Sequence, residues 1–118
     1  MRLLLDENVA GHFQAAISHA LPRLTILRVG EHDAPPKGTL DPEILAWCEE
    51  HNYVLLPNNR RSMPPHLAEY LRQGGHLPGI LVFDREAPLS TLVEDLELIL
   101  SATRPEELAD QIRYLPLP

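Results

Sequence analysis

Polar side chains follow several short apolar runs of the sequence at the point where each run ends. These positions are Asp6, Asn58, Asn59 and Asp84, and Asp41 comes just after the loop that follows the run at 24–29. Carboxylate and amide oxygens are hard ligands, which suit Mg²⁺ or Mn²⁺. A metal ion held by such groups can polarise a phosphodiester and generate a hydroxide nucleophile. If the runs are parallel strands of one sheet, these side chains would meet at one edge.

Arg60 and Arg61 follow the two asparagines and could hold a phosphate through paired hydrogen bonds. Ordinary structural roles compete with all of these assignments. Asp41 suits a helix N-cap, Asp84 a turn, and the arginines a solvated pair. Asp6 is the strongest candidate, because a carboxylate placed directly after a buried strand is costly unless it is paired or functional.

Glu7 and the histidines carry weaker signals. Glu7 is expected to be solvated or to interact with the dipole of the following helix. The six histidines show no metal-ligand spacing. Only His12 and His32 are expected near the ends of strands.

The composition favours one domain over residues 1–118, because 44% of the residues are apolar and can build a core. The formal net charge of −7 argues against broad, non-specific binding of nucleic acid. It leaves room for a local phosphate site and fits a cluster of metal-binding carboxylates.

The same sequence predicts a cytoplasmic protein that does not enter the membrane. No apolar stretch approaches the roughly 20 residues that a bilayer-spanning helix needs. The N-terminus lacks a signal-peptide pattern, and the single cysteine, Cys48, excludes an intrachain disulfide. Cys48 falls in a helical apolar pattern and is expected to be an inert core thiol.

Short apolar runs alternate with helical patterns along the chain. The runs predict strands at 3–5, 24–29, 53–56 and 79–83, and an edge strand within 112–117. The helical patterns predict helices at 9–20, 41–52, 62–73 and 90–100 and a short turn of helix within 105–111, with Asp41, Ser62 and Ser90 as N-caps. This alternation predicts the α/β class, as a three-layer α/β/α sandwich around a mainly parallel sheet. In such sheets, ligands bind beyond the carboxyl ends of the strands.

Three segments together are similar to a known family. They are "LLLDEN", "DPEILAWCEEHNYVLLPNNRRSM" and "GILVF", in order across roughly residues 1–85. They resemble the small bacterial PIN-like proteins, which are related to the toxin ribonucleases of toxin–antitoxin modules. The resemblance implies the same α/β/α fold and a metal-dependent nuclease site. In that site Asp6 is the first metal ligand, Asp41 or Glu43 the second, and Asn59 stands at the third acidic position.

The third motif departs from the family pattern. Pro57 and Asn59 stand where the family usually has threonine and aspartate, and Arg60 stands where it has a further acid. An amide carries no charge, and the arginines would repel a cation, so we expect weaker metal affinity than in a site of four acids. Asp6, Asp41 and Asp84 would then hold one Mg²⁺ or Mn²⁺ ion together with a substrate phosphate.

Two hypotheses follow and stay open at this point. The chain is either a metal-dependent ribonuclease, as the toxin of a toxin–antitoxin module with an antitoxin-like partner, or a catalytically weak or inactive module that binds RNA or a protein. A third option is a regulatory domain that dimerises through an exposed apolar stripe on the helix at 90–100. The resemblance also implies a homodimer.

Overall fold

Helices and strands alternate in the computed structural model, which describes residues 2–9, 11–57, 63–84 and 86–117. The strands are β1 (Arg2–Leu5), β2 (Thr25–Arg28), β3 (Val54–Leu56), β4 (Ile80–Phe83) and β5 (Ile112–Leu115). The helices are α1 (Gly11–Ala20), α2 (Asp41–His51), α3 (Met63–Arg72), α4 (Leu89–Ala102) and α5 (Pro105–Leu108). The predicted order of elements is therefore confirmed in this part of the chain.

The strands form one sheet in the order β2-β1-β3-β4-β5, and every strand pairs with its neighbours in parallel. At the centre, Leu4 of β1 is in register with Leu27 of β2 and Leu55 of β3. Short apolar strands suit this arrangement, because a parallel sheet is covered on both faces and needs apolar side chains on both. The predicted parallel sheet is confirmed.

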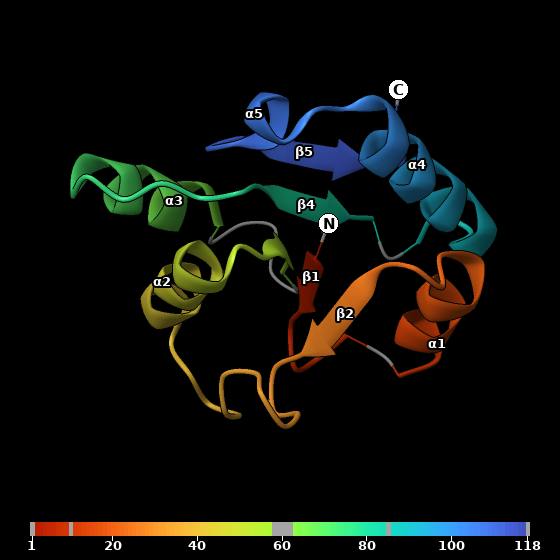
Figure 1. Ribbon diagram of the computed structural model, residues 1–118, viewed down its shortest axis with the longest axis horizontal. Coiled ribbons are helices and arrows are strands. Elements are labelled where there is room, and N and C mark those ends of the chain that lie inside the picture. The colour runs from red at the N-terminus through yellow and green to blue at the C-terminus, as the bar shows by residue number, and fades with distance from the viewer. Residues whose placement is uncertain (1, 10, 58–62, 85, 118) are drawn as a thin grey trace.

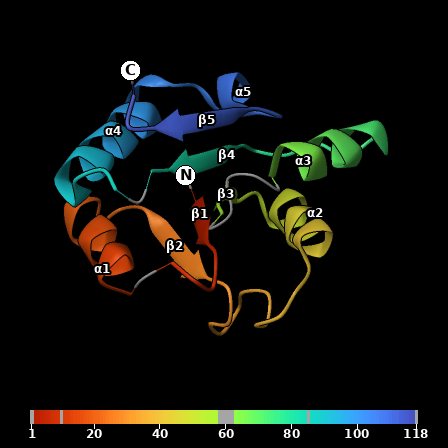
Figure 2. The same ribbon diagram turned by 180° about the vertical axis from the view of Figure 1, so that it is seen from behind.

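The helices cover both faces of the sheet. Leu4 points into a core with side chains of α2 and α3, whereas Leu3 and Leu5 point into a second core with side chains of α1, α4 and α5. This division follows from the strand geometry, in which successive side chains point to opposite faces. Figures 1 and 2 show α2 and α3 on one side of the sheet and α1 and α4 on the other. The chain is a three-layer α/β/α fold, as predicted.

Two of the predicted helix caps are wrong. The N-cap of α2 is Leu40 rather than Asp41, and no side chain caps that helix. The backbone of Leu40 is extended, and Pro42 lies in the first turn of α2. Asp41 is therefore already part of the helix. The N-cap of α4 is Pro88, whose carbonyl accepts the N–H of Leu92, so helical bonding begins before Ser90. The third predicted cap, Ser62, lies outside the described residues.

The apolar face of α4 and the single cysteine both belong to the core. Leu92, Leu96 and Ile99 are buried, so this stripe is explained by packing against the sheet. Cys48 is buried and free, and burial raises the pKa of its thiol to about 12. This agrees with an unreactive core thiol.

Among the described residues, no helix has the length and apolar character needed to cross a membrane.

A polar network joins the segment before β4 to the turn before β5. Asp110 accepts the backbone N–H of Leu77 at 2.7 Å and lies 2.9 Å from Nδ1 of His76. The hydrogen bond and the negative charge of Asp110 raise the pKa of His76. Burial acts to raise the pKa of Asp110, but the Leu77 amide and His76 outweigh it, and the net pKa is lowered.

Replacing a side chain at the centre of the sheet should cost far more than replacing a surface leucine. Leu4 has no exposed surface, so Leu4→Ala should lower the free energy of unfolding by about 2–5 kcal/mol. Leu98 on α4 is 53% exposed, and Leu98→Ala should cost less than about 1 kcal/mol. Urea unfolding of both variants measures the difference. Equal losses would contradict the central placement of β1.

The His76–Asp110 pair should make stability depend on pH in a defined direction. The raised pKa of His76 gives a contribution that is complete below its unfolded pKa, about 6.5, and is lost as pH rises through the folded pKa. The lowered pKa of Asp110 gives a contribution that is complete above its unfolded pKa, about 3.9, and is lost as pH falls through the folded pKa. The pair should therefore stabilise the fold most between about pH 4 and 6.5.

Asp110→Asn tests this pair directly. Asparagine tolerates the left-handed backbone of residue 110, where φ is 62°, so the turn should be kept. An NMR titration should show the pKa of His76 falling toward its ordinary value. The control Glu106→Gln removes a charge from the neighbouring helix α5 and should shift the pKa of His76 much less. An unchanged His76 titration in Asp110→Asn would show that the pair does not form in solution.

Candidate functional site

Asp6 lies at the carboxyl end of the central strand, as the sequence predicts. Its backbone N–H donates to the carbonyl of Leu56 at 3.0 Å, which continues the pairing of β1 with β3. Its Oδ2 accepts the backbone N–H of Asn8 at 3.0 Å, so the carboxylate closes a local turn. The side chain is half-buried. The strand order changes direction between β1 and β3, which is where open parallel sheets bind ligands.

Glu7 has a structural partner that the sequence did not indicate. Its Oε1 accepts the backbone N–H of Gly38 at 3.1 Å. Gly38 belongs to the loop 29–40, which is ordered by its own bonds, including 2.8 Å between Gly30 N and the Pro35 carbonyl. Glu7 therefore ties this loop to the end of β1. Because α1 begins at Gly11, Glu7 does not lie in the first turn of that helix, so the expected pairing with the helix dipole is wrong.

Asp41 and Asp84 each have a partner of their own. Oδ2 of Asp41 lies 3.4 Å from Nε2 of His66 on α3, and the Asp41 side chain is 35% exposed. Asp84 follows β4 and accepts the backbone N–H of Glu86 at 3.0 Å through Oδ1. Asp84 therefore has the turn role that was one of its two interpretations. Asp41 acts as a link between α2 and α3 instead of a cap.

The described residues contain no group of three or more histidine, cysteine, aspartate or glutamate side chains that could hold a metal ion. Asp6, Asp41 and Asp84 therefore do not meet as a preformed three-carboxylate site in this part of the chain. The other proposed site residues, namely Asn58, Asn59, Arg60 and Arg61, lie outside the described residues. Their roles as neutral ligand and phosphate clamp stay predictions from the sequence.

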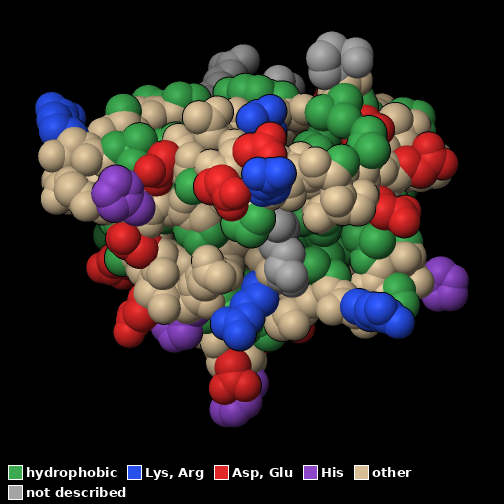
Figure 3. Space-filling model, turned by 45° about the horizontal axis from the view of Figure 1, so that its top comes forward, with side chains coloured by type: hydrophobic (Ala, Val, Ile, Leu, Met, Phe, Trp, Pro, Cys, Tyr) green, Lys and Arg blue, Asp and Glu red, His purple; other side chains and the backbone are tan. Residues whose placement is uncertain are grey.

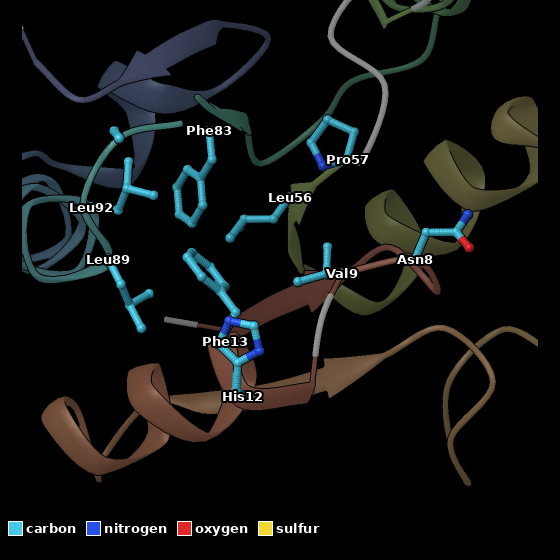
Figure 4. A pocket seen from close by; sticks show the side chains of 10 residues that line it. Asn8, Val9, His12, Phe13, Leu56, Pro57, Phe83, Leu89 and Leu92 are labelled. Carbon is cyan, nitrogen blue, oxygen red and sulfur yellow. The ribbon is translucent and has the colours of Figure 1, made fainter. Parts of the chain in front are cut away.

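A pocket of about 300 Å³ opens beside the segment that follows β1. Its walls come from the carboxyl ends of three central strands and from the facing ends of α1 and α4. The lining residues are Asn8, Val9, His12, Phe13, Leu56, Pro57, Phe83, Ala87, Leu89 and Leu92. Figure 4 shows the rings of Phe13 and Phe83 next to each other in the lining, with Asn8 turned away from both.

Sequence reasoning placed His12 near the strand ends but assigned it no role, and it missed the two phenylalanines as a pair. In the sequence, Phe13 is one of several apolar positions in the helical pattern at 9–20, and Phe83 is the last residue of the apolar run at 79–83. Their ring centroids are 5.0 Å apart with an interplanar angle of 61°. An aromatic side chain at a strand end, directly before Asp84, is the signal that could have pointed to this edge.

Charge is mixed on the face of the molecule that Figure 3 shows. Figure 3 shows one face on which acidic and basic side chains are interspersed with apolar ones, without a broad basic area. This mixture on the visible face accompanies a formal net charge of −7 for the whole chain.

Comparison of the chain with models of protein families, with curated proteins and with solved structures finds no match.

Removing the Glu7 carboxylate should loosen the loop 29–40 without unfolding the domain. Glu7→Ala should speed hydrogen exchange of the Gly38 amide by about 2- to 10-fold, because one exposed hydrogen bond is lost. NMR-detected exchange measures this amide directly. Glu43→Ala, at an exposed position in the first turn of α2, is the control and should leave Gly38 unchanged. Unchanged Gly38 exchange in Glu7→Ala would rule out the tie.

Proposed function

We propose that the chain is a metal-dependent ribonuclease whose site is centred on Asp6. The position of Asp6 carries this proposal: a half-buried carboxylate at the carboxyl end of the central strand, beside the switch in strand order. The parallel three-layer fold, which the PIN-like resemblance also implies, supports it. So does the sequence similarity of the "LLLDEN" and "DPEILAWCEEHNYVLLPNNRRSM" segments to that family.

The described residues fit a loosely held metal ion better than a tightly held one. Mg²⁺ keeps several waters and commonly uses one or two carboxylates together with substrate phosphates, so a cage of protein ligands is not required. Asp6 is the ligand that we propose first, and Asp84 ends another strand at the same edge. Bound there, Mg²⁺ or Mn²⁺ would supply Lewis-acid activation of the phosphodiester and of water.

The chain's own groups would hold the substrate and the ligand side chain in place. The N–H of Asn8 orients the Asp6 carboxylate before any metal ion binds. Glu7 fixes the adjacent loop through Gly38. Arg60 and Arg61 follow β3 in sequence and would bind the phosphate, as the sequence predicts. Because the rest of the chain is acidic, this local pair would supply most of the attraction for RNA.

A second candidate function is a module that binds RNA or a protein partner without cutting. The engagement of Asp41 with His66 favours it, as does the lack of a three-ligand group among the described residues. In either case, we propose a cytoplasmic protein that forms a homodimer. For the ribonuclease, the resemblance further suggests a toxin that is held in check by an antitoxin-like protein.

An RNA-cleavage assay tests the first candidate. Purified full-length chain should cleave a fluorescent single-stranded RNA with Mn²⁺ and not with EDTA. Asp6→Asn keeps the acceptor for Asn8 but removes the charge, so the rate should fall at least about 100-fold, since loss of even indirect ligand partners costs about 10–100-fold. The control is Glu50→Gln. Glu50 is exposed near the C-terminus of α2, at the amino ends of the strands and therefore away from Asp6. Cleavage that persists in Asp6→Asn would overturn the assignment of Asp6.

Calorimetric titration with Mn²⁺ separates the two candidates. Mn²⁺ affinity that rises at least about 10-fold when a non-cleavable single-stranded RNA is present, and that is lost in Asp6→Asn, would support the ribonuclease and count against the non-cutting module. Binding of RNA that needs no Mn²⁺ and is not followed by cleavage would favour that module and contradict the ribonuclease.

A further inference from the structure

The pocket between α1 and α4 lies next to the proposed catalytic edge. Asn8 and Val9 line it, and the Asx turn joins Asn8 to Asp6 at 3.0 Å. Two residues of chain span at most about 7 Å, so the pocket wall begins within that distance of the Asp6 backbone. The volume of about 300 Å³ is at the small end of ligand sites, which fits a single flat ring system.

Two aromatic rings belong to the pocket lining. Phe13 and Phe83 pack edge to face, and both are only half-buried, so each keeps accessible surface. Leu56, at the end of β3, contributes an aliphatic wall beside the two rings. His12 is exposed and stands beside Phe13, as Figure 4 shows. This lining combines two π surfaces, an aliphatic wall and one imidazole at the rim.

We propose that this pocket binds one nucleobase of the RNA substrate, so that the adjoining phosphate lies toward Asp6. The inference rests on the proposed function. It adds a site for the base, whereas the proposed function names groups only for the metal ion and the phosphate. Splayed bases of single-stranded RNA are commonly held by stacking on aromatic side chains. The imidazole of His12, at the rim beside Phe13, would add a further flat surface against the base.

The lining also predicts the kind of selectivity. Most of the wall is aliphatic or aromatic, and the labelled Asn8 amide is turned away from the rings, so reading of the base edge by side-chain amides is weak. Stacking strength should then decide, and a purine should bind more tightly than a pyrimidine. Unpaired RNA is the expected substrate, because a base inside a duplex cannot enter.

A metal-free NMR titration tests the pocket separately from cleavage. The ¹⁵N spectrum of the full chain is followed with AMP, UMP, ribose 5-phosphate and hexanoate as probes. AMP should shift the amides of Val9, Phe13 and Phe83, UMP should do so at higher concentration, and the last two probes should not. Equal shifts with ribose 5-phosphate would mean a phosphate site, and equal shifts with hexanoate a general apolar pocket. Either result overturns the proposal.

Variants on α1 and β4 complete the test. His12→Ala should weaken AMP binding about fivefold, whereas His19→Ala, exposed in the last turn of the same helix, should leave it unchanged. Phe83→Leu keeps an apolar side chain and should weaken AMP binding about 5- to 100-fold. If Phe83→Leu fails to give a folded spectrum, the comparison of AMP with ribose 5-phosphate and hexanoate on the unaltered chain still decides. Equal AMP affinity in His12→Ala and His19→Ala would contradict the part of the proposal that places His12 against the base.

The outcomes also separate this inference from the proposed function. AMP binding at these amides by a chain that does not cleave RNA would support the nucleobase pocket and contradict the ribonuclease. RNA cleavage that depends on Asp6, with no AMP-induced shifts and an unchanged rate in His12→Ala, would support the ribonuclease and overturn the pocket.

Discussion

Burial of β1 on both faces is the constraint on which the rest of this structure depends. Leu3, Leu4 and Leu5 have no exposed surface, which a strand reaches only when helices cover both sides of its sheet. Parallel pairing on both sides meets that need, since each return crossover carries a helix. Polar side chains can follow such strands only where the strands end. The position of Asp6 is therefore a consequence of the core as much as of any chemistry.

Most of the fold could be predicted because short-range patterns decide it. Apolar runs of about four residues separated by helical periodicity are sufficient for a parallel α/β/α sandwich, and the strand at 112–115 was recognisable as an edge. Helix starts were harder, since they depend on backbone conformation rather than on residue type alone. Leu40 caps α2 with an extended backbone, although Asp41 is the better cap by composition.

The candidate site was less predictable, because its partners are distant in sequence. Glu7 accepts the N–H of Gly38, and Asp41 contacts His66. Neither contact can be predicted from the spacing of residues along the sequence. The sequence could place the carboxylates at one edge of the sheet but could not tell which of them already had protein donors. The contact between Phe13 and Phe83 is a stronger example, because α2 and α3 lie between these two residues in the sequence.

Carboxylates have different roles at the two ends of the strands. At the amino ends, Asp110 accepts the N–H of Leu77 and contacts His76, and these bonds connect the start of β5 to the start of β4. At the carboxyl ends of the strands, Asp6 and Asp84 each accept a backbone N–H from two residues further along, so each turn is closed by a bond within the chain. A carboxylate has several lone-pair sites, and one such bond leaves others for a ligand. A metal ion at this edge would therefore act on bound substrate and would not be needed to build the fold.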